Sequence, residues 1–167
     1  LPRAMEGPTS SSAIFYGALS VHMGLFLLLR TFPLWEDSIW LRIAIAVLGL
    51  VTAIIASSIA RVQSSVKTQI AYASITQIGI MFIEVAAGLH WLVLLHFVSN
   101  ASLRTYQLLI SPSVVGYLVH DQFFYFVPPL QRIKNTFVGK LRATFYVLSI
   151  KEWNMNTAAS HYLWNPL

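Results

Sequence analysis

The sequence predicts an all-α protein, a polytopic bundle of about four transmembrane helices followed by a basic C-terminal region. Of its 167 residues, 56% are hydrophobic and only 10% are charged, and the mean hydropathy is +0.65. Soluble domains carry about 25% charged residues, so this composition favours a bilayer over a large soluble core. The chain contains no cysteine, which excludes disulfides and thiolate metal sites.

Hydrophobic segments at residues 11–29, 39–60, 66–89 and 90–110 are each about long enough to cross a hydrocarbon core of roughly 30 Å. The second is the most apolar and has small residues that allow close helix contact, whereas the third and fourth carry many polar groups. Ser111, Pro112 and Ser113 are expected to end the fourth segment. Residues 1–110 are therefore predicted to form the transmembrane part of the chain.

Residues 111–167 differ in composition and are predicted to be a cytoplasmic or interfacial segment. Residues 132–150 combine basic and apolar side chains, which favours an amphipathic helix lying at the membrane surface. Basic residues that follow apolar spans point to the cytoplasmic side of a membrane rather than to nucleic-acid binding. By the same rule, the N-terminus and the loop before Lys67 lie in the cytoplasm. The basic residues of this segment are Arg132, Lys134, Lys140, Arg142 and Lys151.

His96, Asn100 and Arg104 form a polar stripe inside the fourth hydrophobic segment. A helix has about 3.6 residues per turn, so these positions share one face. Ionisable groups are costly in a bilayer and usually face a protein interior or a water-filled path. The stripe therefore favours part of a proton or ion path, and the alternative is a packing stripe bonded to neighbouring helices. We expect Asn100 to bridge His96 and Arg104, directly or through water.

Further polar residues extend this candidate path. Lys67 leads the third hydrophobic segment and either carries protons or marks the interface as a snorkelling side chain. His22 is a lone ionisable residue in the first segment and either joins the path or is bonded locally. Other polar residues can hold ordered water, although a purely structural role is equally ordinary for them. These lesser candidates are Tyr16, Tyr72, Gln77, Glu84 and Glu6.

No enzyme chemistry is visible in the sequence. It has no glycine-rich phosphate loop, no Cys/His spacing suited to a metal and no supported Ser/His/Asp arrangement. We therefore expect no catalytic site, no metal and no cofactor in this chain. Any redox chemistry would belong to partner subunits.

Three stretches carry motifs that occur together in one family of membrane proteins. Residues 4–30 read AMEGPTSSSAIFYGALSVHMGLFLLLR, which is similar to a segment built on A-M-x-G-P-T-P-x-S-A. Residues 62–82 read VQSSVKTQIAYASITQIGIMF, which is similar to the lysine-led helix I-K-x-x-L-A-Y-S-T-x-S-Q-x-G-Y-M-F. Residues 96–109 read HFVSNASLRTYQLL, which is similar to H-x-x-x-H-A-x-x-K-A-x-L-F. Together they resemble the proton-pumping antiporter-like family, which includes the large membrane subunits of respiratory complex I and the Mrp-type sodium/proton antiporters.

The sequence departs from this family pattern at several candidate positions. Asn100 replaces the second His of the third motif, and Arg104 replaces its Lys. Arginine keeps its proton at any physiological pH, so Arg104 is expected to be a fixed charge that tunes its neighbours. Tyr16 stands where the first helix commonly has His, and His22 stands where some antiporters have Lys. These departures indicate a divergent bacterial branch rather than a core complex I subunit.

The resemblance implies that this chain is a fragment of a larger fold built from inverted helical repeats. It also implies translocation of protons or sodium ions across the inner cell membrane, with Lys67 and His96 exchanging protons. The implied partners are the lipid bilayer and other membrane subunits, as in an NADH:quinone oxidoreductase-like translocase. Two alternatives stay open at this point: a membrane subunit of an inorganic-carbon uptake system, and a non-conducting membrane scaffold.

Overall fold

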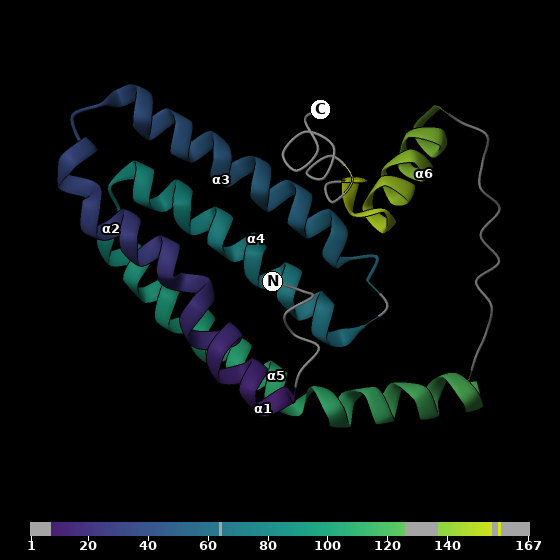
Figure 1. Cartoon of the computed structure of the whole chain (residues 1–167). Coiled ribbons are helices and arrows are strands. Elements are labelled where there is room, and N and C mark those ends of the chain that lie inside the picture. Colours follow the sequence, from purple (N-terminus) through teal and green to yellow (C-terminus); the bar gives the residue numbers. More distant parts are fainter. Residues whose placement is uncertain (1–7, 64, 126–136, 155–156, 158–167) are drawn as a thin grey trace.

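The computed structural model describes residues 8–63, 65–125, 137–154 and 157, and every regular element within them is helical (Figure 1). The predicted all-α class is therefore confirmed. Element η2 is a π-helix, and η3 and η4 are short 3-10 helices. In chain order the elements are α1 (Thr9–Ser12), η2 (Ala13–Leu19), η3 (Ser20–His22), α2 (Met23–Trp35), α3 (Ile39–Ala60), α4 (Val66–Ala87), α5 (His90–Tyr125), α6 (Phe137–Ile150) and η4 (Glu152–Asn154).

Among the described residues, 3 helical segments are long and apolar enough to cross a membrane: Ser10–Trp35, Ile39–Ala60 and Val66–Ala87. They overlap the first three predicted spans, and the bounds of the second are the same. The fourth predicted span lies in α5 but does not belong to this set. Its polar stripe interrupts the apolar run, and the neighbouring Gln107 adds to that effect.

The first span is longer and less regular than predicted. It continues beyond Leu29 to Trp35 and includes Pro33, and its N-terminal part leaves α-helical geometry. In η2 the backbone N–H of Ser20 bonds to Phe15 O, and the Ser20 hydroxyl donates to the same carbonyl at 2.9 Å. A π-helix followed by a 3-10 turn changes which side chains face inward. The side chain of His22, which ends this irregular stretch, is buried.

α4 lies between α3 on one side and α2 with α5 on the other (Figure 1). Two glycines bring α3 and α4 into close contact: a Cβ on Gly49 would lie 2.5 Å from Gly79 O, and one on Gly79 would lie 2.6 Å from Gly49 O. Buried Ala53 extends this contact. The small residues predicted to permit close packing of the second span therefore do so. At the C-terminal end of α4, Arg42 Nε donates to Ala86 O at 2.8 Å.

The main apolar core lies on the other side of α4, where α2, α4 and α5 meet. The outward surfaces of α3 and α5 carry large exposed side chains such as Trp40 and Trp91. Such apolar outer surfaces suit contact with lipid or with further helices. The buried members of the core are Leu25, Phe32, Trp35, Met81, Val85 and Val93.

The prediction that Ser111, Pro112 and Ser113 end the fourth segment is wrong. α5 is a single helix of 36 residues that runs through them to Tyr125. Proline can kink a helix without ending it, and the C-terminal part of α5 points away from the other helices (Figure 1). The division placed between residues 110 and 111 thus falls inside a helix.

The amphipathic helix predicted at residues 132–150 is α6, which begins at Phe137, and residues 132–136 lie outside the described part. α6 packs against α3, and Trp153 Nε1 just beyond it donates to Ser58 Oγ at 3.4 Å. Ser58 is near the end of α3, so α6 lies at the same end of the bundle as the α3–α4 loop (Figure 1).

We expect this shared end of the bundle to face the cytoplasm. A topology reporter inserted after Lys140 is predicted to be active on the cytoplasmic side, because the basic residues there favour that side. A matched reporter in the α2–α3 loop, after Asp37, should show the opposite location. Activity of the Lys140 reporter only outside the cytoplasm would overturn this orientation.

The glycine contact gives a second prediction. Gly49→Ala should lower the stability of the full-length protein by about 1–3 kcal/mol, because its Cβ would meet a carbonyl oxygen that belongs to a packed helix. Gly24→Ala is the matched control, since a Cβ there meets nothing within 4 Å. Thermal unfolding in detergent measures both. Equal melting temperatures for the two variants would contradict the close α3–α4 contact.

Candidate functional site

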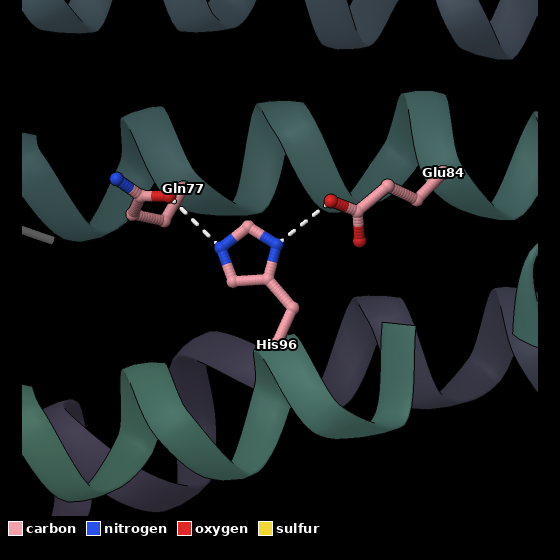
Figure 2. A network of polar contacts seen from close by, with 3 residues as sticks. All are labelled: Gln77, Glu84 and His96. Carbon is pink, nitrogen blue, oxygen red and sulfur yellow. Dashed lines mark hydrogen bonds and ion pairs between the residues drawn. The ribbon is translucent and has the colours of Figure 1, made fainter. Parts of the chain in front are cut away.

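His96 lies between two polar side chains of α4 (Figure 2). Its Nδ1 is 2.8 Å from Glu84 Oε1, and its Nε2 is 2.9 Å from Gln77 Oε1. Gln77 and Glu84 are two turns apart on one face of α4, so the imidazole from α5 fits between them. The side chains of His96 and Glu84 are only 22% and 14% exposed. These three residues form a group that is named the histidine triad below.

The histidine triad accommodates either protonation state of His96. Both partners are oxygen atoms, so a doubly protonated imidazole can donate to each of them and form an ion pair with Glu84. A neutral imidazole can still donate from Nδ1 to Glu84 if the Gln77 amide turns its NH2 group toward Nε2. Within the described residues, Glu84 Oε2 is buried and has no hydrogen-bond partner. That oxygen is an additional acceptor for a proton or a water molecule.

Arg104 is the centre of a second polar group, which is almost fully buried. Arg104 Nε donates to Asn100 Oδ1 at 3.2 Å, and Nη1 donates to Gln107 Oε1 at 2.6 Å. Asn100 Nδ2 lies 3.1 Å from His22 Nε2, and the ring of His22 meets the Phe97 ring edge-on. The exposed fractions of His22, Asn100 and Arg104 are 2%, 4% and 8%.

The predicted stripe therefore turns inward, but its members divide between two groups. Asn100 joins Arg104 to His22, so the expectation that it bridges His96 and Arg104 is wrong. Both ring nitrogens of His96 are instead occupied by partners on α4. The irregular turn of the first span brings His22 to the Asn100 amide, across 78 residues of sequence.

The other candidates occupy varied positions. Lys67 is half-buried in the first turn of α4, about 15 Å from Gln77 along the helix axis. This distance is too long for direct proton exchange between Lys67 and His96. Tyr72 is half-buried on α4. Tyr16 lies in η2, but its side chain is outside the described part, as is all of Glu6.

A cavity of about 300 Å³ lies between the first turns of α4 and the Arg104 end of the stripe. That volume is enough for several water molecules, which the polar half of the lining can bond, while the other half is apolar. The cavity extends from Arg104 toward the end of α4 that carries Lys67. The sequence did not reveal this space, although Gln107 lies one turn beyond Arg104 on the same face. The polar lining residues are Gln69, Arg104, Gln107 and Ser111.

Comparison with known proteins gives one family. Residues 1–125 match the family described as NADH:quinone oxidoreductase/Mrp antiporter, TM. The chain is 34% identical over 122 residues to NADH-quinone oxidoreductase subunit L of Rhodobacter capsulatus, covering 73% of this chain and 17% of that protein. It is 36% identical over 124 residues to NADH-ubiquinone oxidoreductase chain 5 of Aspergillus niger, covering 74% of this chain and 19% of that protein.

A third relative is the chloroplastic NAD(P)H-quinone oxidoreductase subunit 5 of Zea mays, 34% identical over 115 residues, with 69% of this chain and 16% of that protein covered. The chain thus spans less than a fifth of the length of these relatives. No solved structure matches it. The family match covers most of the chain and all three motif-bearing stretches, and the chain therefore belongs to the NADH:quinone oxidoreductase/Mrp antiporter transmembrane family.

Proposed function

We propose that this chain helps to carry protons across the inner cell membrane as part of a multi-subunit complex, with His96 as a proton carrier. The observation that carries the proposal is the histidine triad. An imidazole with a carboxylate on one nitrogen and an amide on the other is partly enclosed by helices. Histidine titrates near neutral pH, which suits it to accept and release protons. The family relatives named as oxidoreductase subunits support a place among other membrane subunits.

The histidine triad can bind and release a proton because His96 has a stable bonding arrangement in each of its two protonation states. A proton that arrives at the bare Nε2 of His96 converts the neutral imidazole to the imidazolium, which the oxygens of Glu84 and Gln77 both stabilise. Rotation of the Gln77 amide then distinguishes the charged from the neutral state, because this amide can accept from Nε2–H or donate to a bare Nε2. The triad therefore holds a proton without leaving either nitrogen unpaired.

Arg104 has a different part in the proposed path. It cannot release its proton at physiological pH, so it is a fixed positive charge near the moving one. Like charges repel more strongly in an apolar bundle than in water, so Arg104 disfavours extra positive charge nearby. The cavity that Arg104 lines extends toward the end of α4 that carries Lys67, and water held there would shorten the distance that a proton must cross between that end and the Arg104 group.

Removal of the carrier is the direct test. His96→Ala and Glu84→Gln, each in the intact complex, should lower proton flux in reconstituted vesicles by about a hundredfold, the low end of the effect of losing a positioned proton-transfer group. Leu95→Ala is the control, because this neighbour on α5 is exposed on the outer surface. Wild-type flux in both triad variants would leave the triad a packing feature and favour the non-conducting scaffold.

A second test concerns the fixed charge. Arg104→Lys should retain more proton flux than Arg104→Gln, because only the former keeps a cation in the buried site. Flux measured in the same vesicles, at several external pH values, compares the two variants. If the glutamine variant transports as well as the lysine variant, the charge of Arg104 has no part in transport.

A further inference from the structure

The side-chain amide of Asn100 joins a buried cation to a buried histidine. Its Oδ1 accepts from Arg104 Nε at 3.2 Å, and its Nδ2 is 3.1 Å from His22 Nε2. Each of the three side chains is more than nine-tenths buried. The arrangement also determines which ring nitrogen of His22 carries a proton, because the oxygen of an amide only accepts hydrogen bonds and its NH2 group only donates them.

The donors and acceptors fix the protonation of His22. A guanidinium only donates hydrogen bonds, so the oxygen of the Asn100 amide must face Arg104. The NH2 group of the amide then faces His22, and this group also only donates. His22 Nε2 must therefore be a bare acceptor. The imidazole is neutral, with its proton on Nδ1.

We propose that Asn100 is a positioning residue that holds His22 in this neutral form and couples protonation of His22 Nε2 to rotation of the amide. The proposal rests on the proposed function and deepens it, because it assigns to Asn100 the coupling of two other candidate residues of the same path, His22 and Arg104. A proton on Nε2 needs an acceptor, which the amide offers only after Oδ1 has turned toward His22. That rotation points the amide NH2 at Arg104, where two donors would then meet.

Arg104 must therefore give up its bond to Asn100 whenever His22 becomes charged. Arg104 also lines the cavity, so water there is able to accept from the released Nε–H. The two bonds exclude each other: either Arg104 holds the amide and His22 is neutral, or His22 is charged and Arg104 turns to the cavity. Protonation of His22 at one end of the Asn100 amide therefore changes the hydrogen bonding of Arg104 at the other end.

Other ionisable groups around His22 do not replace this link. Arg30 is exposed, and Glu84 and His96 are bonded to each other. Arg104 is the cation that shares an amide with His22. On the elements that contact His22, within α5 residues 90–111 and the described parts of α2 and α4, the side chains charged or titrating near neutral pH are Arg30, Lys67, Glu84, His90, His96 and Arg104.

Nitrogen-15 NMR of histidine-labelled full-length protein in lipid bilayers tests the proposal, since the chemical shift of each ring nitrogen reports whether it carries a proton. His22→Gln identifies the His22 signals by their loss. In the wild type at neutral pH, Nε2 of His22 should be bare and Nδ1 protonated. In Asn100→Asp, a carboxylate faces both neighbours, and the ratio of protonated to bare Nε2 should rise at least about tenfold.

Gln107→Leu is the matched control, because it removes another amide acceptor of Arg104 and leaves the Asn100 amide in place. Its His22 signals should match the wild type. A protonated Nε2 of His22 in the wild type at neutral pH would overturn the proposal, and this outcome does not depend on whether any variant folds. Unchanged His22 signals in Asn100→Asp would overturn it as well. The measurement does not depend on transport: wild-type proton flux in both His96→Ala and Glu84→Gln would reject the proposed function, whatever the state of His22.

Discussion

A guanidinium that cannot lose its charge determines how the polar groups of this bundle are oriented. Arg104 is nearly buried, so its N–H groups need acceptors, and two amides on its own helix supply them. Their oxygens must face it, which sends the NH2 group of Asn100 to His22. His96 is in the reverse situation, because both atoms facing it are oxygens. The bundle thus contains one histidine whose Nε2 faces a donor and another whose two ring nitrogens both face acceptors.

The packing of α3 against α4 keeps the two partners of His96 in place. Gly79 lies two residues after Gln77, which puts it on nearly the opposite face of α4. The contact with Gly49 on that face fixes the depth and rotation of α4, because neither backbone has room to shift. Gln77 and Glu84 are consequently held at the level of His96. An apolar contact that carries no charge positions the polar group on the far side of the same helix.

The sequence predicted the parts of this fold that depend on local patterns. The bounds of α3 and the start of α4 were correct, because an apolar run with polar flanks defines a span. The inward direction of the stripe also followed, since helical periodicity places its residues on one face. The partners did not follow. The contact between His22 and Asn100 depends on where two distant helices meet, and Gln77 and Glu84 were candidates with no indication that both bind His96.

The irregular first span has a consequence for how such a chain tolerates insertions and deletions. A π-helical stretch holds more residues per turn than an α-helix, so it behaves like an insertion absorbed without a loop. Loss of one residue between 13 and 19 would let this stretch become regular α-helix with nearly the same relative rotation of the segments before and after it, whereas gain of one residue would rotate them by about 100°. With an added residue, the N-terminal part could keep its contact with α5 only if His22 turned away from Asn100. The span therefore tolerates loss of a residue better than gain of one, and an insertion there would separate the buried cation from its histidine without changing either side chain.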